Sequence, residues 1–149
     1  EEAEALRSAG VPFETVPGIT SAVGVPAAAG IPVTHRGVSA SFTVVTGHRE
    51  QGGSTNVAWE SLAQVGGTIV VLMGVAERAV IARRLIAGGL SADTPVAAIR
   101  WGTRPEQHTV RTTLADLGDT PIESPSTIVI GAVAAFDFTA NEIETGMVI

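Results

Sequence analysis

The chain of 149 residues contains no cysteine, no lysine and no tyrosine. The lack of cysteine excludes disulfide bonds, thiolate catalysis and cysteine-ligated metals, and nothing in the composition points to an oxidising compartment. We therefore expect a cytoplasmic protein. No apolar run approaches the ~18 residues that a membrane-spanning helix needs, so we expect no membrane partner.

Positive charge is also scarce, and arginine supplies all of it. Nine arginines stand against 15 acidic residues, and the formal net charge is −6. An acidic chain without basic runs is a poor candidate for nucleic-acid binding, so we expect no nucleic-acid partner. The histidines, His35, His48 and His108, are scattered and have no carboxylates at ligand spacing, so the sequence predicts no metal site.

Aromatic residues make up only 4 % of the chain, whereas 45 % of it is apolar, so the core must be built from Val, Ile, Leu and Ala. Several segments are predicted as strands of one sheet, because they alternate or are continuously apolar. They are residues 41–46, 68–73, 95–101, 107–113 and 126–134. The segments at 95–101 and 107–113 form a predicted hairpin, which makes the sheet mixed.

Helical segments are predicted before and between these strands. They are residues 2–9, 20–29, 57–64 and 75–87, with one further helical turn at 114–117. An additional short strand is expected at 12–16, and a loop is expected at 48–56, where two glycines adjoin.

The run from Val16 to Ala22 joins a turn to the start of a helix. Pro17 and Gly18 favour a turn, and Thr20 or Ser21 then offers a hydroxyl N-cap. A helix N-terminus beside a hydroxyl pair suits a polar or nucleotide-like ligand. An ordinary strand-to-helix turn has the same local pattern, so these residues alone leave both interpretations open.

Several short segments recur in the order and at the separations of one enzyme family. They are Val16–Ala22, Gly30–Arg36, Val45–His48, Met73–Val75, Gly102–Thr103 and Glu123–Pro125. Through them, residues 1 to 136 resemble the tetrapyrrole methylases. Two glycine-rich segments of that family, G-x-G-P-G-D and G-G-D-P-x-x-F-G-R, have no counterpart here. The resemblance is therefore to the carboxy-terminal half of the family's fold.

The resemblance implies an α/β fold in three regions. Residues 1–37 are expected to be a remnant of the amino-terminal methylase domain and a linker. Residues 38–136 are expected to be the carboxy-terminal domain, a mixed five-stranded sheet flanked by helices. Residues 137–149 match no known segment and are expected to form a disordered tail.

The resemblance implies part of a C-methyltransferase. Enzymes of this kind transfer methyl groups from S-adenosyl-L-methionine to ring carbons of uroporphyrinogen III, which gives precorrin-2 for sirohaem or cobalamin synthesis. The implied partners are a tetrapyrrole substrate and a second copy of the enzyme, and no metal is needed. Two alternatives stay open: a sister precorrin methyltransferase, and a non-catalytic module for dimerisation or ligand binding, since the glycine-rich half is absent. We expect the chain alone to be inactive.

Site residues are carried over from the family by position. The resemblance implies contacts with the methyl donor for Thr20, Ser21, Ala22, Met73, Gly102 and Ser126. It implies substrate binding for Arg36, His35 and His48, because a guanidinium pairs well with carboxylates. Glu1 matches a glutamate for which the family implies proton transfer.

Each of these residues also has a structural interpretation. Thr20 and Ser21 would cap a helix, and Met73 would fill the core at the end of a strand. Gly102 would be a plain turn glycine, and the histidines would hold the backbone of a linker and a loop.

Overall fold

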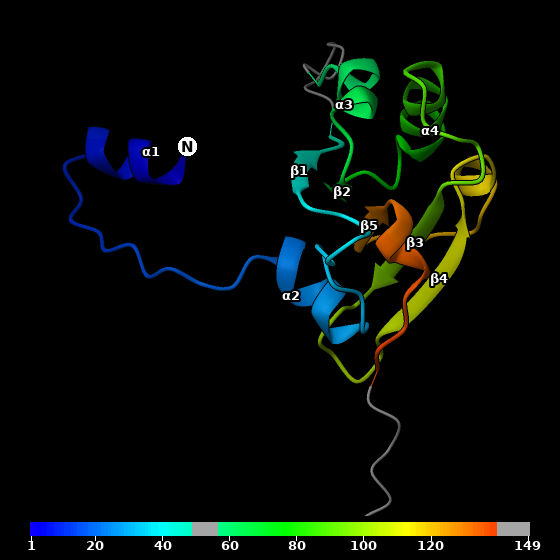
Figure 1. The fold of residues 1–149 in the computed structure, drawn as a ribbon. Coiled ribbons are helices and arrows are strands. Elements are labelled where there is room, and N and C mark those ends of the chain that lie inside the picture. Colours follow the sequence, from blue (N-terminus) through cyan, green and yellow to red (C-terminus); the bar gives the residue numbers. More distant parts are fainter. Residues whose placement is uncertain (49–56, 140–149) are drawn as a thin grey trace, which may run out of the picture.

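The computed structural model describes residues 1–48 and 57–139. Five strands form one mixed sheet with the order β1-β2-β5-β3-β4 (Figure 1). They are β1 (Phe42–Thr46), β2 (Thr68–Leu72), β3 (Pro95–Arg100), β4 (His108–Thr113) and β5 (Ser126–Ile130). The expected mixed α/β sheet is confirmed. Residues 49–56 of the expected loop and residues 140–149 of the expected tail lie outside the described residues.

The strand directions decide where a site forms. β1 and β2 are parallel, and β5 is antiparallel to both β2 and β3. β3 and β4 form the predicted antiparallel hairpin. The carboxyl ends of β1, β2 and β3 therefore lie at the same end of the sheet as the amino end of β5. This end of the strands, called the ligand edge below, brings together chain segments that are far apart in sequence.

Helices cover both faces of the sheet (Figure 1). On one face lie α3 (Trp59–Val65), α4 (Arg78–Ala87) and the short 3₁₀ helix η1 (Asp116–Gly118). On the other face lie α2 (Ser21–Ala28) and the 3₁₀ helix η2 (Ala132–Ala135). Among the described residues, none of the helices has both the length and the apolar character needed to cross a lipid bilayer.

The two faces carry separate apolar cores. The larger core is centred on Trp59, which is 1 % exposed, and on Ile81 and Leu85 of α4. The smaller core packs Val25 of α2 against Ala97 and Val129 of the central strands. Alanine and valine at these contacts allow the helix to approach the sheet closely. Aliphatic side chains thus build most of both cores, as the composition predicts.

The expected strand at residues 12–16 is wrong. Helix α1 (Glu2–Ser8) stands apart from the sheet, and an extended segment joins it to α2 (Figure 1). Val16 in this segment is 81 % exposed. A strand requires a neighbouring strand to satisfy its backbone hydrogen bonds, and no described strand lies beside this segment.

Two predicted elements are shorter than expected. The last strand ends at Ile130, because Gly131 has a φ of 135° and turns the chain into η2. The helix expected at 75–87 begins at Arg78, after a turn over residues 75–77. Its buried residues are Ile81, Ala82 and Leu85, which pack in the larger core with Trp59 of α3 and Leu117 of η1.

The first residues of the expected tail are ordered against the fold. The Phe138 N–H donates a hydrogen bond to the Gly30 carbonyl oxygen at 2.9 Å. The Asp137 carboxylate lies 3.3 Å from the Arg111 guanidinium, and its hydrogen bonds with Thr139 lower the pKa of Asp137 from the usual range. The expectation of disorder is therefore wrong for residues 137–139.

Candidate functional site

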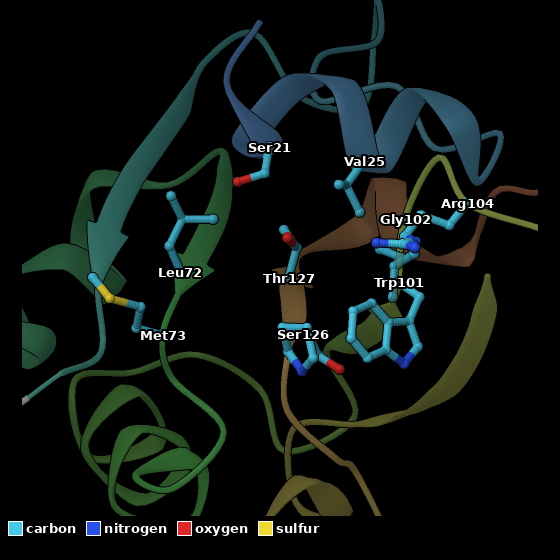
Figure 2. Close-up of a pocket in the computed structure, with 11 residues that line it drawn as sticks. Ser21, Val25, Leu72, Met73, Trp101, Gly102, Arg104, Ser126 and Thr127 are labelled. Atoms are coloured by element: carbon cyan, nitrogen blue, oxygen red, sulfur yellow. The ribbon is translucent and has the colours of Figure 1, made fainter. Parts of the chain in front are cut away.

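A cavity of about 460 Å³ opens at the ligand edge (Figure 2). It lies between the N-terminal turn of α2, the ends of β2 and β3, and the start of β5. Its lining consists of Ser21, Val25, Leu72, Met73, Ile99, Trp101, Gly102, Arg104, Pro125, Ser126 and Thr127. Four of the residues predicted to contact the methyl donor, Ser21, Met73, Gly102 and Ser126, thus meet around one space.

Met73 follows the last residue of β2 and has a left-handed backbone, with a φ of 54°. Its side chain is 65 % exposed and lies at the wall of the cavity, so Met73 does not fill the core (Figure 2). The chain around it is tightly placed. The Gly47 N–H donates a hydrogen bond to the Leu72 carbonyl oxygen at 2.7 Å, which ties the end of β1 to the end of β2.

Gly102 has a packing role that the sequence did not indicate. A Cβ atom at this position would lie 2.4 Å from Cγ1 of Val25. Since real side chains do not approach so closely, the missing Cβ allows α2 to dock on the loop after β3. The space beside the Gly102 Cα on this side is therefore filled by Val25.

The hydroxyl pair at the start of α2 is divided between two roles. The Thr20 Oγ1 accepts a hydrogen bond from the Ala22 N–H at 3.2 Å, so Thr20 is the N-cap. Ala22 is 0 % exposed, and neither Thr20 nor Ala22 lines the cavity. Both members of the pair are exposed, and the Ser21 hydroxyl points toward the cavity (Figure 2).

Ser126 lies between two neighbouring cavities. Its Oγ donates a hydrogen bond to the Glu123 carbonyl oxygen at 2.5 Å. A second cavity, of about 350 Å³, shares Met73, Pro125 and Ser126 with the first and adds His48. His48 therefore lies next to the predicted donor site.

The structure does not bring His35 and Arg36 into the cavity lining. They lie on a turn that is closed by hydrogen bonds from the His35 N–H to the Ser39 carbonyl oxygen and from the Ser39 N–H to the His35 carbonyl oxygen, each 2.9 Å. The His35 ring packs against Phe136, with 4.9 Å between ring centroids, and stacks on Phe138 at 6.4 Å. Arg36 is exposed at the tip of this turn.

Glu1 lies away from the cavity. It immediately precedes α1, and its side chain is fully exposed. His108 is likewise exposed, on β4. Within residues 1–48 and 57–139, no group of three or more His, Cys, Asp or Glu side chains is placed to hold a metal ion.

Sequence reasoning missed Trp101 and Arg104, which both line the cavity. The sequence places Trp101 at the end of an apolar run, which favours its interpretation as the last residue of a buried strand. In the structure β3 ends at Arg100, and Trp101 has a left-handed φ of 52°. The adjacent Gly102 and Pro105 were the available signal, because they mark a loop at the carboxyl end of a strand.

The sequence model of the family described as Tetrapyrrole (Corrin/Porphyrin) Methylases matches residues 1–118. The chain belongs to the tetrapyrrole methylase family. The resemblance predicted from its short segments is confirmed.

Relatives of this methylase chain carry related names. The chain is 46 % identical over 140 residues to the uroporphyrinogen-III C-methyltransferase of Priestia megaterium. The matched region covers 91 % of the chain and 59 % of the relative. The chain is also 43 % identical over 155 residues to the S-adenosyl-L-methionine-dependent uroporphyrinogen III methyltransferase of Methanosarcina barkeri. This matched region covers 99 % of the chain and 60 % of the relative.

Solved structures of tetrapyrrole methylases have the same fold. The uroporphyrin-III C-methyl transferase from Thermus thermophilus complexed with S-adenyl homocysteine matches with a TM-score of 0.79 at 32 % identity, over 90 % of this chain and 57 % of that one. Cobalt precorrin-4 methyltransferase matches with a TM-score of 0.77 at 26 % identity, over 89 % of this chain and 57 % of that one. The chain thus spans a little over half the length of these relatives.

Proposed function

We propose that the chain forms part of an S-adenosyl-L-methionine-dependent C-methyltransferase that converts uroporphyrinogen III to precorrin-2. One observation carries the proposal: Ser21, Met73, Gly102 and Ser126, which are distant in sequence, surround a single cavity at the ligand edge. The relatives' names support the same reaction. In this proposal, residues 38–136 are the carboxy-terminal methylase domain and residues 1–37 belong to the domain before it.

The cavity suits the methyl donor in both size and chemistry. Its volume of about 460 Å³ lies in the usual range for small-molecule sites. Val25, Leu72 and Ile99 provide an apolar wall, and the Ser21 hydroxyl provides a polar group at the opening. We assign Ser21, Met73, Gly102 and Ser126 to the donor, with Thr20 and Ala22 supporting Ser21 through the helix cap.

When bound, the donor would supply a methyl group on a sulfonium sulfur; in-line transfer to a ring carbon of the substrate would form a carbon–carbon bond as the methyl–sulfur bond breaks, leaving S-adenosylhomocysteine. The protein's own task is to hold the two reactants in that alignment and to exclude water. The apolar wall serves the second purpose. We assign His48, in the adjoining cavity, to the substrate.

Arg36 and His35 are proposed to act at the outer side of the substrate, where the exposed Arg36 guanidinium would pair with a carboxylate. Glu1 is proposed to accept the ring proton that leaves after methylation. Both roles require the remainder of the family's fold, because the structure places Glu1 and Arg36 outside the cavity lining. We therefore expect this chain to lack turnover by itself.

We further propose a homodimeric enzyme that works in the cytoplasm without a metal. Support for a covered surface comes from the edge strand β1, where Phe42 and Val44 are 39 % and 43 % exposed on the face that carries α2. Exposed apolar side chains that cluster on an edge strand are typical of protein interfaces. The absence of cysteine supports the compartment.

Titration calorimetry of the 149-residue chain with S-adenosylhomocysteine tests the donor site. We expect weak binding that is lost in Met73→Trp, because the indole would fill the cavity. Val65→Trp is the matched control, since Val65 is 68 % exposed on α3 and does not line the cavity. The control should bind like the unaltered chain.

Two results would contradict the proposal. Undiminished binding by Met73→Trp would place the donor elsewhere. No binding by a chain with a folded circular dichroism spectrum would show that these residues do not form a donor site by themselves.

A further inference from the structure

The segment from Glu123 to Ser126 lies between three cavities at the ligand edge. Pro125 and Ser126 line the largest of them, which is called the donor cavity here because the donor is assigned to it above. With Ser124 they also line the adjoining cavity that contains His48. Glu123 and Ser126 line a third cavity, of about 160 Å³. A displacement of this segment would therefore change the shape of the donor cavity.

Arg100, the last residue of β3, contacts this segment from the far face of the sheet. Side chains alternate between the two faces along a strand. Arg100 therefore shares a face with Ala98 of the larger core, whereas Ile99 points to the other face and lines the donor cavity. The Arg100 Nη1 lies 2.7 Å from Oε2 of Glu123. Arg100 and Ser126 are also register partners where β3 pairs with β5.

The same guanidinium lies close to Trp101, the next residue of the chain. The Arg100 guanidinium carbon is 5.8 Å from the centroid of the indole, which is within the range of a cation–π contact. Trp101 and Ser126 both line the donor cavity (Figure 2). One charged side chain is therefore in contact with both the loop after β3 and the segment before β5.

The ion pair keeps the Arg100 guanidinium in this position. The Arg100 side chain is only 34 % exposed, and its buried Nε has no hydrogen-bond partner among the described residues. A partly desolvated charge is destabilised when its counter-charge is removed. The Glu123 carbonyl oxygen in turn accepts the hydrogen bond from the Ser126 hydroxyl, at 2.5 Å. Contacts that fix Glu123 therefore also fix the Ser126 hydroxyl.

We propose that Arg100 is a positioning residue for the methyl-donor site, because its ion pair with Glu123 fixes the segment that walls the donor cavity. Neither Arg100 nor Glu123 lines that cavity, so the effect is transmitted through Pro125 and Ser126. The proposal rests on the function proposed above, since that function assigns this cavity to the donor.

Titration calorimetry of the 149-residue chain with S-adenosylhomocysteine tests this role. Arg100→Gln and Glu123→Gln should each weaken binding about two- to fivefold, the range expected for a partly exposed ion pair. A direct electrostatic effect on the ligand would instead have opposite signs in the two variants, because they remove opposite charges. The double variant should bind no more weakly than either single variant, since the same interaction is lost only once.

The ion pair between Arg84 and Glu60 is the matched control. It has the same 2.7 Å separation but joins α4 to α3, and neither residue lines the donor cavity. Glu60→Gln should lower the free energy of unfolding in urea, as Glu123→Gln does, and should leave the affinity for S-adenosylhomocysteine unchanged. A purely structural role for Arg100 would make the two ion pairs behave alike.

Three results would overturn the proposal. The first is unchanged or tighter binding by either Arg100→Gln or Glu123→Gln, measured where the variant is folded. The second is a loss in the double variant equal to the sum of the two single losses in binding free energy. The third is an equal loss of affinity in Glu60→Gln.

Amide hydrogen exchange at Ser126, measured without ligand, separates failure of this proposal from failure of the proposed function. Exchange should be about two- to fivefold faster in Glu123→Gln and unchanged in Glu60→Gln. If the unaltered folded chain binds no S-adenosylhomocysteine, the proposed function fails for this chain, and exchange alone decides whether the ion pair fixes the segment. If the ligand binds and is lost in Met73→Trp while Arg100→Gln has no effect, only the positioning role is wrong.

Discussion

Met73 and Trp101 face each other across the cavity, and both have left-handed backbone conformations, with φ angles of 54° and 52° (Figure 2). Each directly follows the last residue of a strand, Leu72 of β2 and Arg100 of β3. These strands flank β5 on either side and run in the same direction. The left-handed residue after each of these strands therefore places a large side chain beside the first residues of β5.

Replacing Met73 by glycine should stabilise the fold while weakening the site. The left-handed conformation costs a residue with a Cβ about 1 kcal/mol, and the exposed Met73 side chain loses little packing. We expect the free energy of unfolding in urea to rise by up to about 1 kcal/mol and the affinity for S-adenosylhomocysteine to fall. Ala76→Gly, in the exposed turn before α4, should instead lower stability. A destabilised Met73→Gly would show that the backbone there is not strained.

Gly102→Ala should loosen the docking of α2. The new Cβ would lie 2.4 Å from Cγ1 of Val25, which is 8 % exposed in the smaller core and has little room to move. We expect a loss of about 1–3 kcal/mol in the free energy of unfolding, as for an overpacked core. Gly18→Ala is the control, because a Cβ there meets nothing within 4 Å. Equal effects of both substitutions in a urea titration would contradict this packing role.

The ion pair between α3 and α4 should make stability depend on pH in the acidic range. Arg84 donates two hydrogen bonds to the Glu60 carboxylate, each at 2.7 Å. The bond from Arg84, helped by a backbone hydrogen bond, lowers the pKa of Glu60 from 4.5 to about 2, while the pKa of Arg84 is raised. The unfolded chain therefore binds this proton more readily than the folded protein. The stabilisation is complete above about pH 4.5 and is lost as the pH falls toward 2.

Thermal unfolding of the chain and of Glu60→Gln, followed between neutral pH and pH 2, measures this effect. Other carboxylates titrate in the same range, so the difference between the two proteins is the relevant quantity. The difference should be largest near neutral pH and should shrink on acidification. A difference that stays constant with pH would show that the ion pair does not stabilise the fold.

Phe138→Ala should loosen the turn that carries Arg36. Phe138 lies 5.2 Å from the Phe136 ring and stacks on His35, so its loss removes one side of the packing around that turn. Amide hydrogen exchange at His35 and Ser39 should become about two- to tenfold faster, which corresponds to one aromatic contact. Phe42→Ala, at the exposed edge strand, should leave these two amides unchanged. Unchanged exchange in Phe138→Ala would show that the turn is held by its own hydrogen bonds.

Periodicity and composition were sufficient for the elements whose partners are close or whose pattern is strong. The continuous apolar run predicted at 68–73 and the alternation predicted at 107–113 correspond to β2 and β4, Thr68–Leu72 and His108–Thr113. The segment at 12–16 has a similar local pattern but forms no strand, because pairing depends on a neighbour rather than on the residues themselves. The same reason explains Trp101, whose apolar surroundings predict a strand although its backbone is left-handed.

The sequence by itself determined the family of this protein and the kinds of side chain that it can use. Its order of short segments identified the family, and the absence of cysteine and lysine limited the available side-chain chemistry. The tertiary structure alone decided which residues meet. The antiparallel insertion of β5 between β2 and β3 placed Ser126 beside Met73 and Trp101, and the packing of Val25 on Gly102 brought Ser21 to the same cavity. Such contacts depend on strand order and direction, which are properties of the whole chain and leave no local signal.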